Sequence, residues 1–312
     1  MVKWDLLRNA GVAAAAGALG GLETQAASPE PAGGKPRTLA LIGDRYHSYD
    51  YIRTGLDRIF KEIGLPVRYT TNCSDLSPSL LKPYQLFICF RDNMIWPSGY
   101  LGPDQWTDAG FLENPEEFPS AKPENWITEE QGEAVKDFVA AGNGFYSLHC
   151  NALVSNSSKN YRDVQGGGVL YHPNPQPATS YPALRPFKVH VANKEHPVTQ
   201  GVEDFIVTDE QYFTIYDKDP KNILLHGENL DGLTFAPDYR EFGGRSQRGP
   251  ENQAAGGGAL HTLGTVSTSG WAHEYGTGRV VFTALGGTIH SMWQPEHLKM
   301  QKNAVRWLLK MT

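Results

Sequence analysis

Four groups of polar residues in this chain are able to carry chemistry. They are Asp44 with Tyr46 and His47, the pair His149 and Cys150, His172, and Asp209 and Glu210 with Tyr212. Histidine titrates near neutral pH, and with a carboxylate it can move protons at a sugar hydroxyl or at the carbon beside a ketone. The residues expected to act as acids, bases or catalytic partners are His149, Glu210, Asp209 and His47.

Metal-assisted chemistry is a second hypothesis for the same residues. Imidazole and carboxylate groups are ligands of zinc and of other divalent ions, and His149 and His172 are the expected ligands. The sequence has no compact H-x-x-x-H or C-x-x-C spacing. The cofactor is therefore left open, with a divalent metal such as zinc as the candidate.

Other cofactors and nucleophiles find less support. Neither G-x-G-x-x-G nor a P-loop follows the first predicted strand, so we expect no nicotinamide dinucleotide. Cys150 follows a predicted strand and histidines are available as bases, which is a third hypothesis, a cysteine-dependent hydrolase. A nucleophile on a strand-to-helix turn normally has small flanking residues, whereas Leu148 lies two places before this cysteine.

The elements predicted around these residues position them at one edge of a sheet. Residues 38–42, 67–71, 86–90 and 145–148 are predicted as strands, with helices at residues 51–63 and 128–141. Strand, helix and strand in about thirty residues form a βαβ unit, which predicts a mostly parallel sheet. Strands one and four of such a sheet can both end at the topological switch point, so His47 and His149 are expected to share one cleft.

The second half of the chain is expected to be less regular. Residues 161–186 are predicted to be a loop, and short strands are expected at residues 187–191, 206–208 and 223–226. A hairpin is predicted at residues 271–283 and a final helix at residues 295–310. Asp44, Tyr46, Tyr212, Trp271 and His290 are the expected substrate-binding residues.

Composition and charge limit the partners. The 312 residues have a net charge of −6, which gives no basic face for a nucleic acid.

Residues 1–27 combine Lys3 and Arg8 with an apolar, Ala-rich run, which is the pattern of a signal-like leader. The paired arginines of a twin-arginine signal are missing. We expect an exported protein, periplasmic or extracellular, with no stable membrane anchor once the leader is removed. Residues 28–37 are a linker, followed by a single domain over residues 38–312 with insertions at about 94–127 and 236–262.

The chain resembles the ThuA-like (trehalose utilisation) family. The matching residues are Gly144 to His149, Gly167-Gly168 with His172-Pro173, His196-Pro197, Asp209-Glu210-x-Tyr212, Trp271-x-His273-Glu274-Tyr275-Gly276-x-Gly278-Arg279, Leu285-Gly286 and Val305-Arg306-Trp307. The resemblance implies an α/β fold similar to class I glutamine amidotransferases, with a flavodoxin-like sheet, helices on both faces, loop insertions and a C-terminal hairpin. It also implies sugar metabolism on oxidised (3-keto) glycosides, with His149 at the place where an amidotransferase carries its cysteine.

The leading hypothesis is an exported carbohydrate-processing enzyme, a hydrolase or a lyase or isomerase, that acts on a sugar or 3-keto-glycoside. Its partner would be a small carbohydrate ligand. Two alternatives stay open. One is a non-catalytic carbohydrate-binding module, and the other is a Cys150-dependent hydrolase of amidotransferase type. The sequence does not determine the oligomeric state.

Overall fold

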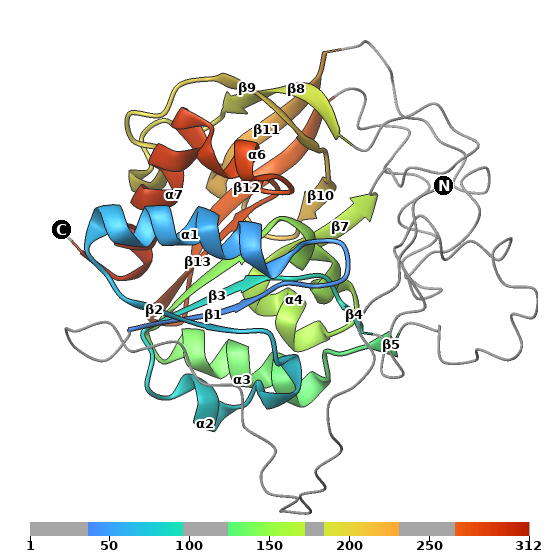
Figure 1. The fold of residues 1–312 in the computed structure, drawn as a ribbon, viewed down its shortest axis with the longest axis vertical. Helices are drawn as coiled ribbons and strands as arrows, with labels where there is room; N and C mark the ends of the chain where they lie inside the picture. Colours follow the sequence, from blue (N-terminus) through green and yellow to red (C-terminus); the bar gives the residue numbers. More distant parts are fainter. Residues whose placement is uncertain (1–36, 96–123, 172–183, 231–265, 312) are drawn as a thin grey trace, which may run out of the picture. The chain divides into compact units, whose positions relative to one another are not determined.

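The computed structural model describes residues 37–95, 124–171, 184–230 and 266–311 (Figure 1). The predicted leader, nearly all of the linker, most of the first predicted insertion, all of the second and His172 lie outside the described residues.

A single sheet of eleven strands forms the core of the described chain. Its main path runs β2-β1-β3-β6-β13-β12-β11-β8-β9; β7 and β10 pair with each other, and β10 also pairs with β12. The strands up to β13 are parallel, and the pairs from β13 to β9 are antiparallel. The bounds are β1 Thr38–Ile42, β2 Val67–Thr70, β3 Leu86–Phe90, β6 Gly144–Leu148, β7 Gly167–Tyr171, β8 Leu184–Val191, β9 Phe205–Glu210, β10 Phe213–Tyr216, β11 Ile223–Asn229, β12 Val266–Tyr275 and β13 Gly278–Thr283.

The central strands are buried on both faces. Every residue of β1, β3 and β6 is buried, as their continuous apolar sequences predict. Strands β4 (Met94–Ile95) and β5 (Glu124–Asn125) form a separate two-stranded pair at the two ends of one undescribed segment.

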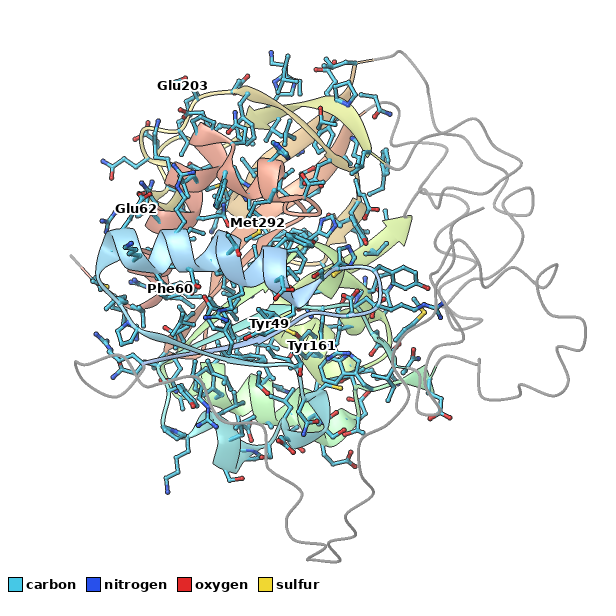
Figure 2. The ribbon with its side chains drawn as sticks, viewed as in Figure 1. Tyr49, Phe60, Glu62, Tyr161, Glu203 and Met292 are labelled. Atoms are coloured by element: carbon cyan, nitrogen blue, oxygen red, sulfur yellow. The ribbon has the colours of Figure 1, made fainter. Side chains whose placement is uncertain are left out.

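Helices cover both faces of the sheet (Figure 1). One face carries α1 (Tyr49–Ile63), α6 (Ile289–Trp293) and α7 (Pro295–Leu308), and the other carries α2 (Pro78–Leu81), α3 (Glu129–Ala140) and α4 (Lys159–Gln165). In Figure 2, Phe60 and Met292 lie on the first side and Tyr161 on the second. Phe60 and Met292 belong to one buried apolar cluster and Tyr161 to the other, so the sheet separates two cores.

Capping residues set the bounds of the predicted helices. Ser48 caps the start of α1 and accepts a hydrogen bond from the amide of Asp50, and Gly64 ends that helix in the left-handed conformation. Thr128 and Gln131 form the predicted capping box at α3. The final helix begins at Pro295, as predicted.

The predicted α/β fold, with parallel central strands, helices on both faces of the sheet and a C-terminal hairpin, is confirmed, but the prediction of a loop over residues 161–186 is wrong. That region contains most of α4, all of β7 and the start of β8. Seven residues are too few for α4 to show helical periodicity, and only its caps, Ser158 and Gly166, indicate it. Strand β7 begins with two glycines, which are rare in strand interiors. None of the helices in the described residues has the length and apolar character needed to cross a membrane.

Candidate active site

The polar residues predicted from the ends of β1 and β6 lie together at the carboxyl edge of the parallel strands. In the sheet, β1 and β6 lie on either side of β3. The rings of His47 and His149 have centroids 5.0 Å apart and meet nearly at right angles. The predicted proximity of the two histidines is therefore confirmed.

His149 lies on a sharp turn between β6 and the 3-10 helix His149–Asn156. Its φ of 52° is in the left-handed region, which is unusual for a residue with a side chain. Asn151 anchors this turn because its side-chain amide donates to the carbonyl of Arg91, at the end of β3 (3.2 Å). His149 Nδ1 is 2.8 Å from the carbonyl oxygen of Ala284, and a carbonyl can only accept. Nδ1 therefore carries a proton, and Nε2 is directed towards Glu210.

His47 is held in the same manner by Asp44. Its Nδ1 lies 2.9 and 3.1 Å from the two carboxylate oxygens of Asp44. The backbone amides of Tyr46, His47 and Asp92 also donate to this carboxylate, each at 2.8 Å. Burial alone would raise the pKa of Asp44, but His47 and the amide donors lower it. Asp44 is therefore ionised and fixes the His47 ring with Nε2 directed away from it.

Glu210 completes the group. Its Oε2 atom lies 3.3 Å from His149 Nε2 and 3.6 Å from His47 Nε2. The side chain of Glu210 is 22% exposed, whereas those of His47 and His149 are 6% and 0% exposed. We call these three residues the reactive cluster. It is open to solvent on the glutamate side.

Asp209, next to Glu210, has a different position. It is fully buried and accepts hydrogen bonds from the amide of Gly286 (2.7 Å), the hydroxyl of Ser291 (2.5 Å) and the amide of Glu210 (2.9 Å). Burial raises its pKa, against the opposing effect of His149 and of these donors. Asp209 thus ties the end of β9 to the Gly286 turn and to α6, and it positions Glu210.

Aromatic rings surround the two histidines. The Phe90 ring centroid lies 5.9 Å from that of His47 and 5.7 Å from that of His149. Tyr212 packs edge-on against His149 with centroids 4.6 Å apart, and it is buried. Sequence reasoning named Tyr212 but missed Phe90, which the sequence shows only as the last residue of an apolar strand.

Three further residues near the cluster were not predicted. Asp92 is buried, and burial together with the Asp44 carboxylate raises its pKa to about 7. Tyr51 has a buried hydroxyl with no hydrogen-bond partner among the described residues, and burial raises its pKa. Gly287 lies against the cluster, because a Cβ there would be 2.7 Å from His149 Nε2 and 2.6 Å from Asp209 Oδ1. The sequence signals available were Arg91-Asp92 after β3 and the glycine pair before α6.

Cys150 does not have the surroundings of a nucleophile. Its side chain is fully buried, and burial raises the pKa of the thiol well above its usual value. Its sulfur lies 3.5 Å from Asp44 Oδ2, and it is His149 that occupies the strained turn.

The remaining predicted binding residues lie in varied positions. Tyr46 is 48% exposed and precedes His47 in the chain. Trp271 is fully buried, donates to the carbonyl of Gln165 and packs on Phe282, so it offers no surface for substrate. His290 is exposed on α6, and no hydrogen bond or ion pair joins it to the cluster within the described residues.

Among the residues that the structure describes, ligand atoms for a cation converge in two overlapping groups. The reactive cluster offers three atoms within 4.8 Å of one another, and so do Asp44, His47 and Cys150.

A cavity of about 500 Å³ lies elsewhere, lined by residues that include His196, His273 and Trp307. Ala272 and Glu274 in its lining pair with Val281 and Arg279, towards the start of β13, so this cavity is at the opposite end of the strands from His149.

Comparisons with known proteins agree with the fold. A ThuA-like protein from Bacteroides uniformis is similar over 90% of this chain and 95% of its own chain, at 17% identity and a TM-score of 0.51. A ThuA-like protein from Parabacteroides merdae is similar over 88% of this chain and 90% of its own chain, at 15% identity and a TM-score of 0.50. A glutamine amidotransferase from Thermotoga maritima is also similar, at 11% identity, with 88% of this chain and 98% of that one covered and a TM-score of 0.44.

At the level of sequence, no curated protein matches. The ThuA family, described as "Trehalose utilisation", matches residues 46–308, a stretch that contains His47, His149 and Glu210. This match covers most of the 312 residues. The chain belongs to the ThuA family.

Proposed function

We propose that this protein is an exported enzyme of carbohydrate metabolism that acts on a 3-keto-glycoside or a related sugar by proton transfer. One observation carries the proposal. The Nε2 atoms of His47 and His149 both face the Glu210 carboxylate, while their Nδ1 atoms are held by Asp44 and by the carbonyl of Ala284.

The hydrogen bond to Ala284 supports His149 as the base. Because Nδ1 is held by this carbonyl, Nε2 is the ring nitrogen that is directed into the cluster and placed to take a proton. In a keto-sugar, a base can remove the proton from the carbon beside the ketone, and the electron pair of that C–H bond moves to form an enolate on the ketone oxygen. Glu210, on the solvent-facing side, would contact the sugar hydroxyls or return the proton.

Three observations support a sugar as the ligand and export of the protein. Tyr46 is exposed next to His47, and an aromatic ring can stack on the apolar face of a sugar. The leader expected at residues 1–27 supports export, and the family description supports carbohydrate as the substrate class.

Solvent exchange in D₂O tests the proposal without knowledge of the product. Purified protein is incubated with a panel of 3-keto-glycosides, and NMR follows the proton on the carbon beside the ketone. We expect exchange or product formation with the wild-type protein, and a loss of at least about 100-fold in His149→Asn and Glu210→Gln.

A matched control is His190→Asn. His190 also lies between two carboxylates, but Asp204 contacts its Nδ1 and Glu228 its Nε2, and none of these residues belongs to the reactive cluster. This variant should keep full activity. Equal exchange in wild type and His149→Asn would overturn the assignment. Calorimetric binding of the glycosides with neither exchange nor product would instead indicate a carbohydrate-binding module.

A further inference from the structure

We infer that His47, His149 and Glu210 bind one divalent metal ion of the zinc type through two imidazole nitrogens and one carboxylate. The inference rests on the proposed function for the site and the substrate class, and it changes the base: an Nε2 lone pair that binds the ion cannot also remove a proton, so a water or hydroxide on the ion would take that role. It rests on the positions of the three side chains and on the hydrogen bonds that hold them.

Three acceptor atoms converge in the reactive cluster. The proton of His149 is on Nδ1, where it meets the Ala284 carbonyl, and the Nδ1 proton of His47 meets the Asp44 carboxylate. The Nε2 atom of each ring therefore faces the same oxygen of Glu210, at 3.3 and 3.6 Å. One cation placed between them would coordinate all three atoms, which lie within 4.8 Å of one another.

The spacing fits tetrahedral coordination. With metal–ligand bonds of about 2.0–2.1 Å, adjacent ligand atoms of a tetrahedral zinc site are about 3.3–3.4 Å apart. The two nitrogen–oxygen distances in the cluster lie close to this value. Two histidines and one glutamate are a ligand set of catalytic zinc sites, in which the fourth position stays open.

The outer hydrogen bonds have the arrangement that metal-binding histidines use. A ligating imidazole normally donates its second N–H to a carboxylate or a backbone carbonyl, which fixes the tautomer and the ring orientation. Asp44 serves His47 in this way and the carbonyl of Ala284 serves His149. The strained backbone of His149 adds to the argument, since such strain persists where a side chain must be held in place.

The overlapping group of Asp44, His47 and Cys150 fits a metal less well. The Asp44 carboxylate already accepts hydrogen bonds from three backbone amides as well as from His47. Cys150 is fully buried, so an ion there would have no open position. Glu210 is partly exposed, which places the open position of the proposed site on its solvent side. An ion bound there would polarise the ketone oxygen of a substrate or activate a water molecule.

Metal content and binding test the inference. The full-length protein is treated with a chelator, dialysed, and titrated with ZnCl₂ by calorimetry, and plasma mass spectrometry counts the bound ions. We expect one ion per chain, with affinity reduced about 100-fold or more in Glu210→Gln and His149→Asn, and unchanged in the control His190→Asn. Circular dichroism shows whether each variant is folded. Glu210→Gln is the variant expected to disturb folding least, because the Glu210 side chain is partly exposed.

Two results would overturn the inference. One is folded, metal-free wild-type protein that binds no zinc at micromolar concentration. The other is an ion bound equally well by wild type, Glu210→Gln and His149→Asn. D₂O exchange with the metal-free protein separates this inference from the proposed function. Exchange that requires His149 but no metal ends the metal assignment and leaves the function standing. One zinc ion held by the three residues, without exchange or turnover, supports the site and contradicts the function.

Discussion

The Nε2 atom of His149 lies 3.3 Å from Oε2 of Glu210, although the two residues are 61 positions apart in the chain. His149 ends a central parallel strand, and Glu210 ends a strand of the antiparallel part of the sheet. Asp209 connects the two parts through its hydrogen bonds to Gly286 and Ser291. The reactive cluster therefore depends on the folding of the whole domain.

Gly287→Ala should impair activity while the fold is kept. The new Cβ would lie 2.7 Å from His149 Nε2 and 2.6 Å from Asp209 Oδ1, so one of these side chains must move. A misplacement of about 1 Å in an active site can cost about 100-fold in rate, and we expect a fall in kcat/KM of that order. Steady-state kinetics measure it, with thermal unfolding as a check on the fold.

Gly201→Ala is the matched control for that substitution. A Cβ at Gly201 meets nothing within 4 Å, but its φ of +70° makes alanine strained by about 1–2 kcal/mol. This variant should lose stability and keep its activity. If Gly287→Ala were as active as Gly201→Ala, the positions of His149 and Asp209 would not matter for activity, and the assignment of the reactive cluster would be contradicted.

Cys150 should not react with iodoacetamide in the folded protein. Its side chain is fully buried and burial raises its thiol pKa, so neither access nor thiolate is available. Mass spectrometry of the native protein after treatment should show Cys150 unmodified, and activity should be retained; the unfolded protein provides the positive control. Rapid modification of Cys150 with loss of activity would favour the cysteine-dependent hydrolase.

Acid should destabilise the protein partly through His273. Burial, with Lys218 nearby, lowers the pKa of His273 from 6.5 to about 4 in the folded state. Between these values the unfolded chain binds a proton that the folded protein does not, so stability is present above pH 6.5 and falls as the pH falls towards 4. A shift of this size corresponds to roughly 3 kcal/mol.

His273→Gln removes this titration. Urea unfolding at pH 7 and at pH 4.5 should show a smaller loss of unfolding free energy in the variant than in the wild type. The variant will be less stable at pH 7, because His273 Nε2 donates to the carbonyl of Val164. The comparison therefore uses the difference between the two pH values. An equal loss in both proteins would contradict the prediction.

Much of the parallel half could be predicted from the sequence because its signals are local. Continuous apolar runs predict strands β1 and β3, and a capping box predicts the start of helix α3. Helix α4 and strand β7 were missed because a seven-residue helix and a glycine-led strand carry little periodic pattern. The fold class follows from order and spacing, so these errors did not affect it.

The site was predicted in part for the same reason. The proximity of His47 and His149 could be predicted because both residues follow buried strands. The contact with Glu210 could not be derived, since it depends on how β9 packs against α6 through Asp209 and Ser291. Asp209 and Glu210 look alike in sequence, and only burial separates a positioning carboxylate from one that faces the imidazoles. His172, the second predicted metal ligand, lies outside the described residues.

The central claim is that His149 and Glu210 act as parts of one reactive centre, and a double-mutant cycle on kcat/KM tests it most directly. The proteins compared are wild type, His149→Asn, Glu210→Gln and the double variant, on the keto-glycoside that the wild type turns over. Residues that act as a unit are strongly non-additive. We expect each single variant to lose about 100-fold or more, and the double variant to lose little beyond the worse of the two. Losses that multiply in the double variant would show that the two residues act independently and would contradict the account.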